Sequence, residues 1–331
     1  MTKAATLLQT KEAYIACGQD SDLTADALGV SQRTVQYRLK EMRKKGLLAS
    51  QGASLPPLIQ TQPRPVVRVR AITSETPPEG PLLKVLVIGD AHDGPGLPDK
   101  SRFTWIGKHI EETQPDYVVD IGDSCTFDSL CSYSANDTYE GKLKPSVQAD
   151  LDSYDKAMDA LYSACPTWQG PRLKTMGNHE DRIKSFENRN PEIFGMIAGE
   201  YRRILERYRI QETPYGEFKF IGGVGFIHTP MNIMGRPYGG KTMAPIANDA
   251  TFDIVFGHTH KEGTHRAPKI GPQNYVKIVN VGCALPWGHV EDYASKATTG
   301  WWWGIVELKL QGGHIISNHA IPMTELERLY G

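Results

Sequence analysis

Five short polar motifs occur along this chain, and each follows directly on an apolar, strand-like run. In chain order they are Asp90-Ala91-His92, Gly122-Asp123, Gly177-Asn178-His179-Glu180, His228 and Gly257-His258-Thr259-His260. An open α/β sheet carries its ligand-binding loops at the carboxyl ends of its strands, so the motifs are expected to converge at one sheet edge. The pattern therefore predicts a single site built from histidines, aspartates and an asparagine.

The region from Leu82 onward alternates apolar runs with polar helical stretches, which is typical of an α/β fold. Strands are expected at residues 83–89, 117–122, 173–176, 218–227, 252–256, 275–281, 301–310 and 314–321. Helical periodicity is clear at residues 147–165 and 193–208.

The first fifty residues contain no proline and have the pattern of a helix-turn-helix. Gly29 allows the positive backbone angle that a tight turn between two helices needs. Ser31 is a good N-cap for the second helix. Val35, Leu39 and Met42 fall on one face of that helix and are expected to pack against the first.

The second of these helices is strongly basic, which suits a helix lying in the major groove of DNA. We expect Arg33 and Gln36 near base edges, with Arg38 and Lys40 on phosphates. The alternative is a small helical bundle for protein contact or dimerisation, in which the charges form a solvated face. The Gly-Val-Ser turn favours the DNA-binding interpretation more than the charge does.

A proline-rich stretch separates these helices from the α/β region. Residues 51–81 hold seven prolines and are expected to form an extended linker. Within them, residues 65–70 alternate enough to form a short edge strand. Three parts are therefore predicted: a helix-turn-helix domain at 1–50, a linker at 51–81 and an α/β domain at 82–331.

Composition excludes several classes of protein. The net charge is −1, so any signal for nucleic acid must be local. We expect no membrane span, because no apolar run approaches the roughly 18 residues it needs, and the N-terminus lacks a signal-peptide core. The five cysteines are odd in number and scattered, which indicates reduced thiols in a cytoplasm. Homo-oligomerisation is left open.

The polar motifs suit two adjacent divalent ions, which need nitrogen and oxygen ligands and a bridging carboxylate. Asp90 and His92 offer a pair of ligands to one ion, and Asp123 can bridge both. Asn178 offers an uncharged oxygen, which keeps the site from becoming too anionic to admit a phosphate. The remaining ligands would be His228, His258 and His260.

These motifs in this order resemble the calcineurin-like metallophosphoesterase superfamily, whose pattern is D-x-H, G-D, G-N-H-[DE], H and G-H-x-H. The resemblance covers about residues 83–320 and implies a β-sandwich flanked by helices, here preceded by the all-α domain. By the resemblance, the ligands of the first ion are Asp90, His92, Asp123 and His260. Those of the second ion are Asp123, Asn178, His228 and His258.

The resemblance also implies a reaction, the in-line attack of a metal-bridging hydroxide on phosphorus. His179 would be the general acid that protonates the leaving oxygen. Glu180 would orient His179, or it would be a plain surface glutamate. Manganese is the expected metal, and zinc, iron or nickel would also suit the ligands.

Two departures from named branches bear on the substrate. The Ser/Thr phosphatase pattern G-D-x-V-D-R-G has an arginine that is missing after Gly122-Asp123, which counts against protein phosphatase activity. Segments 127–133, 139–141 and 235–241 instead resemble bacteriophage-encoded members, which would place the chain in the cytoplasm of a bacterial host. Arg236 or Lys241 could then meet a substrate phosphate, with Arg182 a weaker candidate. A glycine-rich turn with solvated charges is the alternative.

The run Trp301-Trp302-Trp303 has two interpretations. It could be a platform on which bases stack. In an alternating strand, however, Trp301 and Trp303 share a face, so core or interface packing is favoured.

Three functions follow. The favoured one is a two-metal phosphodiesterase or nuclease tethered to DNA by the N-terminal module. The second is a phosphoesterase acting on small phosphate esters or cyclic nucleotides, with that module serving regulation or assembly. The third is a non-enzymatic DNA-binding regulator that only senses a metal or ligand.

Overall fold

The computed structural model describes residues 3–48, 79–131, 143–238, 243–270, 275–291, 294 and 299–331. The chain divides into two units at residue 73, and each is described by itself. Most of the predicted linker, including the edge strand at 65–70, lies outside the described residues.

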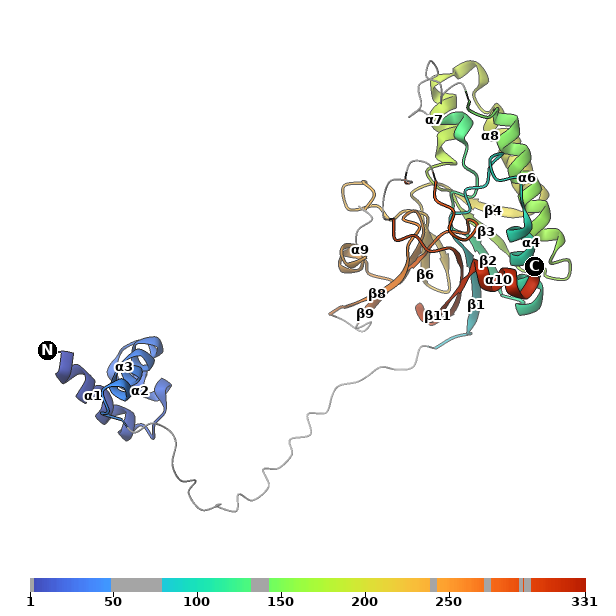
Figure 1. Ribbon diagram of the computed structural model, residues 1–331. Coiled ribbons are helices and arrows are strands. Elements are labelled where there is room, and N and C mark those ends of the chain that lie inside the picture. The colour runs from blue at the N-terminus through green and yellow to red at the C-terminus, as the bar shows by residue number, and fades with distance from the viewer. Residues whose placement is uncertain are drawn as a thin grey trace. The chain divides into compact units, whose positions relative to one another are not determined.

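The N-terminal unit is a three-helix domain of α1 (Lys3–Ala16), α2 (Ser21–Leu28) and α3 (Gln32–Lys44) (Figure 1). Gly29 ends α2 with φ of 59°, and the Ser31 hydroxyl accepts a hydrogen bond from the Thr34 amide at the start of α3. Val35, Leu39 and Met42 are buried against the other two helices. The turn, the cap and the packing face are as predicted.

The second unit contains a six-stranded sheet in the order β11-β10-β1-β2-β3-β4. Strands β1 to β4 run parallel, and β10 and β11 are added antiparallel at the β1 edge. The bounds of its strands are β1 (Leu83–Ile88), β2 (Tyr117–Asp120), β3 (Arg172–Thr175), β4 (Ile210–Thr213), β10 (Gly304–Gln311) and β11 (His314–Pro322).

A five-stranded sheet in the order β5-β6-β7-β9-β8 packs on the first. Its three central strands are parallel and its two edge strands antiparallel. The bounds of its strands are β5 (Lys219–Ile221), β6 (Val224–Ile227), β7 (Ile254–Phe256), β8 (Glu262–Pro268) and β9 (Tyr275–Val281). Valines such as Val87, Val119 and Val255 fill the space between the sheets. The result is the predicted β-sandwich.

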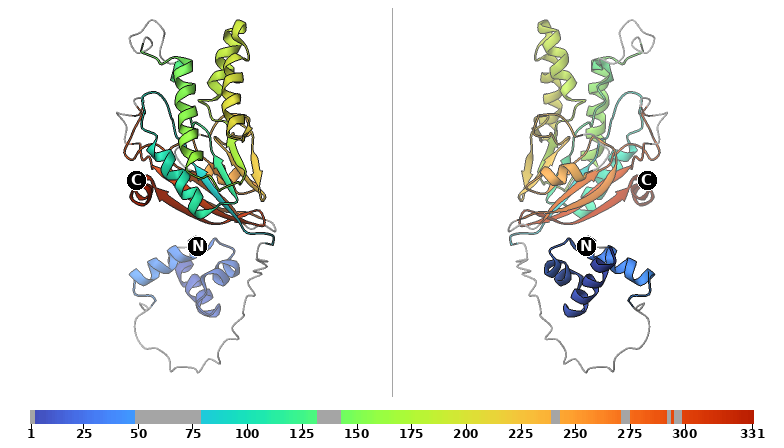
Figure 2. Two further views of the ribbon diagram at one scale, coloured as in Figure 1. Left: turned by 90° about the vertical axis from the view of Figure 1, so that its right-hand side faces the viewer. Right: turned by 90° about the vertical axis from the view of Figure 1, so that its left-hand side faces the viewer.

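Helices cover both outer faces of the sandwich (Figures 1 and 2). Four of them, α4 (Ser101–Thr113), α6 (Val147–Ser163), α8 (Met196–Arg207) and α10 (Met323–Tyr330), share an apolar core with the outer face of the six-stranded sheet. The short α9 (Ala244–Asp249) packs on the other sheet. The single turn η1 (Asp128–Leu130) lies between β2 and α6 in sequence, and the single turn η2 (Pro191–Ile193) follows α7 (Asp181–Arg189).

Several expectations are corrected. The strand expected at 218–227 is a hairpin of β5 and β6, because Gly222 and Gly223 turn the chain with φ of 54° and 86°. The strand expected at 301–310 begins at Gly304, so Trp301, Trp302 and Trp303 all precede it. The metal-site motifs also follow strands of two sheets, not of one sheet edge.

Among the described helices, none has both the length and the apolar character needed to cross a bilayer. All five cysteines are described, and each is a free thiol.

Candidate metal centre

The five polar motifs meet where the carboxyl ends of the two sheets lie together. Three follow β1, β2 and β3 of the six-stranded sheet, and two follow β6 and β7 of the other. Backbone hydrogen bonds join neighbouring loops: the His92 amide donates to Asp123 O at 2.9 Å, and the Gly257 amide donates to His228 O at 3.0 Å. The site therefore draws its residues from both sheets of the sandwich.

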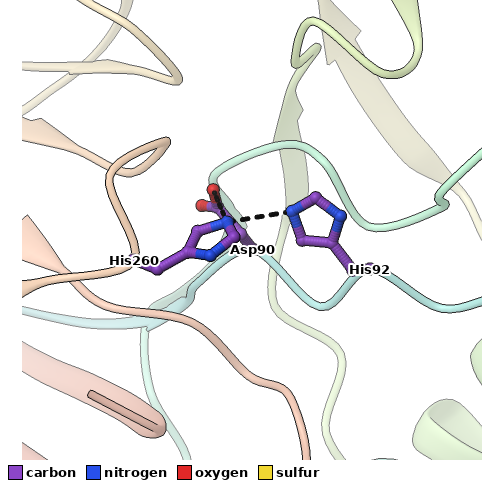
Figure 3. Close-up of side chains that lie close together, drawn as sticks. All are labelled: Asp90, His92 and His260. Atoms are coloured by element: carbon purple, nitrogen blue, oxygen red, sulfur yellow. Dashed lines mark hydrogen bonds and ion pairs between the residues drawn. The ribbon is translucent and has the colours of Figure 1, made fainter. Parts of the chain in front are cut away.

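One cluster consists of Asp90, His92 and His260, all buried (Figure 3). The Nε2 atoms of His92 and His260 face each other at 3.0 Å, and Nε2 of His260 also lies 3.2 Å from Oδ2 of Asp90. Within the described part of the chain, the buried Nδ1 atoms of both rings have no hydrogen-bond partner. Two imidazole nitrogens and a carboxylate oxygen directed at one point fit a divalent cation.

The second cluster brings together Asp123, Asn178, His228 and His258. Nε2 of His228 lies 3.1 Å from Oδ2 of Asp123 and 3.2 Å from Oδ1 of Asn178, and ligand atoms of His258 complete the group. Nδ1 of His228 donates to Ile121 O at 3.0 Å, which leaves Nε2 free to bind a metal.

The Asp123 carboxylate lies between the two clusters. Its Oδ2 is 3.1 Å from Nε2 of His228 in the second cluster and 4.0 Å from Nε2 of His92 in the first. That is the place a bridging ligand must take. All seven predicted ligands are therefore brought together.

Two motif glycines are explained by close approach. A Cβ on Gly177 would lie 2.0 Å from Oδ1 of Asp123, and one on Gly257 would lie 2.3 Å from Oδ1 of Asp90. Any larger residue would displace a carboxylate of the site. Four of the candidate ligands also have positive φ, which is costly for non-glycine residues and common at functional sites: His92, Asp123, His258 and His260.

The electrostatics of the second cluster favour a cation. Burial raises the pKa of Asp123, but the neighbouring His228 and His179 outweigh it and hold that pKa well below its usual range. Burial lowers the pKa of His228, yet the carboxylates of Asp123 and Asp90 raise it to about 9. A metal ion that replaces the His228 proton would neutralise the same carboxylates.

Glu180 has neither of its expected positions. Its carboxylate is buried and accepts hydrogen bonds from the amides of Asp123, Ser124 and Gly177, each at 2.9 Å. It contacts the buried ammonium of Lys174 at 3.1 Å. Glu180 is thus neither a surface residue nor the orienting partner of the His179 ring; it ties the Asp123 loop to the loop of Asn178.

His179 is oriented by a carbonyl. Its Nδ1 donates to Thr126 O at 2.7 Å, and Nη2 of Arg182 lies 3.1 Å from its Nε2. A guanidinium only donates, so Nε2 of His179 is the acceptor in this contact. Arg182 also donates to Thr126 O and lies 3.5 Å from Asp128. Arg182 therefore lies at the site.

The other residues proposed to contact a substrate phosphate are Arg236 and Lys241. Arg236 is exposed on the turn after β6, and its amide donates to Oδ1 of Asn232 at 3.2 Å. Lys241 lies outside the described residues. Trp301, in contrast, lies at the site, with its ring centroid 4.2 Å from that of His260.

On α3, Arg33, Gln36 and Lys40 are exposed as predicted. Arg38, in contrast, is half-buried. Its guanidinium donates to the Thr10 hydroxyl at 3.2 Å, which holds the side chain against α1. Sequence reasoning missed Tyr37, which is 59% exposed beside Gln36. The helical period of α3 places position 37 away from the buried face, so its exposure could have been predicted from the sequence.

The fold is a β-sandwich that carries two clusters of candidate metal ligands at one end. A model of the calcineurin-like phosphoesterase family matches residues 83–262. The chain belongs to this family, and its clusters of histidine and aspartate side chains could hold metal ions.

Among solved structures, the chain is similar to a purple acid phosphatase from seeds of yellow lupin (Lupinus luteus), at 12% identity and a TM-score of 0.36. The similarity covers 74% of this chain and 54% of the lupin protein, so the chain spans about half of that protein's length. No curated protein matches.

Proposed function

We propose that this protein is a phosphodiesterase that cleaves DNA and is brought to its substrate by the helix-turn-helix domain. The observation that carries this proposal is α3, which begins at a formed cap and exposes Arg33, Gln36 and Lys40. Such a helix suits contacts with phosphates and base edges. The chain joins it to a phosphoesterase centre, and DNA is a phosphodiester that both parts can engage.

The residues of the centre have separate tasks in this proposal. Asp90, His92 and His260 would hold one ion and Asn178, His228 and His258 the other, with Asp123 shared. Two bound divalent ions would polarise the phosphoester and lower the pKa of a coordinated water. Manganese is the proposed metal; the mixed nitrogen and oxygen donors also suit zinc, iron or nickel.

His179 and Arg182 would act on the substrate itself. A phosphate entering the site offers Arg182 a stronger, charge-assisted partner than Nε2 of His179. Once Arg182 moves to the phosphate, Nε2 is free to carry a proton, while Thr126 O keeps the ring oriented. His179 can then donate that proton to the leaving oxygen.

The test separates DNA targeting from chemistry. Full-length protein and a variant lacking residues 1–50 are compared under manganese on long duplex DNA and on bis-p-nitrophenyl phosphate. We expect the deletion to impair DNA cleavage and to leave hydrolysis of the small diester intact. Equal DNA cleavage by both proteins would favour a small phosphate ester or cyclic nucleotide as substrate. Hydrolysis of neither substrate would favour a non-enzymatic regulator.

A substrate panel sharpens the result. Single-stranded DNA, duplex DNA, RNA, cyclic nucleotides and phosphomonoesters are assayed on the same manganese-loaded sample, whose metal content is measured in parallel. A preference for monoesters in metal-loaded protein would contradict the proposed diesterase activity.

A further inference from the structure

The three consecutive tryptophans lie in three different environments. Trp302 packs against the core between the sheets, and a Cβ on Gly282 would lie 2.5 Å from its ring. Trp303 packs against the helical core, donates from Nε1 to His289 O at 2.7 Å and contacts the Trp287 ring. Packing therefore accounts for both of these side chains.

Trp301 belongs to none of the apolar clusters formed by the described residues. Its side chain is half-buried, and it meets the ring of the metal-ligand candidate His260 at an interplanar angle of 72°. The amide of Trp302 donates to His260 O at 2.8 Å, which holds this segment against the ligand loop. A large indole is thus held at the first metal cluster with part of its surface open.

Such a ring suits a flat, uncharged partner. Base-stacking aromatic residues tolerate any base, because every base has a π-face, and their replacement by alanine typically costs about five- to a hundredfold in affinity. In a nucleotide a single sugar separates the base from its phosphate. A phosphate at the metal clusters would therefore place its own base within reach of a ring that contacts His260.

We propose that Trp301 stacks on the base of the nucleotide whose phosphate lies at the metal centre. The inference rests on the proposed function and adds a nucleobase subsite to it. It also assigns to the site a ring that the sequence pattern had placed in a strand.

The experiment measures binding, so it does not depend on turnover. Manganese-loaded full-length protein is titrated calorimetrically with thymidine 5′-monophosphate and with 2-deoxyribose 5-phosphate, which lacks the base. We expect wild-type protein to prefer the nucleotide on the order of tenfold. Trp301→Ala should abolish that preference, and Trp301→Phe, which keeps a smaller ring, should retain part of it.

Two controls accompany the variant. Phe220→Ala removes another partly exposed ring, 52% exposed on β5, and should keep the preference. Manganese titration of Trp301→Ala should give an affinity within about twofold of wild type, since the stacking role leaves His260 as a ligand.

Three outcomes would overturn the proposal: a preference that survives in Trp301→Ala, no preference in wild-type protein, or a loss of manganese from the variant. The last would show that Trp301 serves to support His260. Absence of diester hydrolysis would count against the proposed function and leave this binding result standing. A 5′-phosphorylated oligothymidylate, titrated in parallel, distinguishes a strand end from a free nucleotide by its tighter binding.

Discussion

The ammonium group of Lys174 lies 3.1 Å from the carboxylate of Glu180, and both side chains are buried. Lys174 also donates to Asp120 at 2.9 Å and to the hydroxyl of Ser124. Burial lowers the pKa of Lys174, but the carboxylates of Asp120 and Glu180 outweigh it and raise that pKa well above the usual value. One cation therefore balances two carboxylates directly beneath the loop that carries Asp123.

Lys174→Met should destabilise the fold, because it leaves both carboxylates buried without a cation. We expect a loss of about 3–5 kcal/mol in the free energy of unfolding, measured by urea denaturation. Arg203→Ala, which breaks an exposed pair with Glu200, should change it by less than about 1 kcal/mol. A similarly small effect of Lys174→Met would show that the pair is not required.

Glu180→Gln should weaken metal binding, because a side-chain amide has a single acceptor oxygen and cannot accept from all the backbone amides that the carboxylate holds. Loss of comparable support around metal ligands typically costs about 10- to 100-fold in affinity. Manganese affinity measured by calorimetry checks this. The matched control is Glu187→Gln: Glu187 accepts from the amides of Gly195, Ile197 and Ala198, away from the metal clusters. Equal manganese affinities in the two variants would argue against the role of Glu180.

His179→Ala should lose turnover and keep its metal, since His179 is placed to donate a proton and is not one of the seven ligands. General acid catalysis is worth about 10²- to 10⁴-fold, so kcat on bis-p-nitrophenyl phosphate should fall within that range. Metal analysis of the same sample is the control. Wild-type turnover in the variant would show that the acid is another group.

Arg33→Ala combined with Lys40→Ala should weaken DNA binding and make it less sensitive to salt. Each phosphate contact that is lost lowers the slope of log affinity against log salt by about 1. Fluorescence anisotropy at several salt concentrations measures both effects. Lys11→Ala on α1 is the control and should change neither. An unaltered salt slope in the double variant would mean that α3 does not contact phosphate.

Glu307→Gln should change the acid stability of the second unit. A hydrogen bond from His109 at 2.9 Å lowers the pKa of Glu307, although burial opposes it. The folded state thus binds this proton more weakly than the unfolded chain does, so the interaction stabilises above about pH 4.3 and is lost as the pH falls through the folded pKa. Urea denaturation between pH 7 and about pH 3 should show the difference between wild type and variant shrinking once the pH falls below about 4.3. A constant difference would contradict the linkage.

The convergence of the candidate metal ligands could be predicted from the sequence, because each motif follows an apolar strand. Strand direction then places the motifs at a common end of the fold, whether the strands belong to one sheet or two. Gly29 and Ser31 were equally predictable, because a positive φ and an N-cap are local requirements. Polar strands were not: β4 has the sequence IQET, and β8 has the sequence EGTHRAP and lies at a sheet edge.

Residues whose roles depend on tertiary contacts also escaped prediction. A lysine in a strand is normally expected to face solvent. Only the tertiary structure shows that the side chain of Lys174 is buried between Asp120 and Glu180. Glu180 follows a histidine in sequence, yet its carboxylate turns to the amides of another loop. Trp301 was assigned to a strand that begins three residues later.

The division of the ligands between the sheets has a mechanical consequence. Asp90, Asp123 and Asn178 follow strands of one sheet, and His228 and His260 follow strands of the other. Ions held by both sets would link the two sheets at this end of the sandwich. Chelation should then loosen that end first, and amide hydrogen exchange would rise in the loops after β2 and β7 before the valine layer opens.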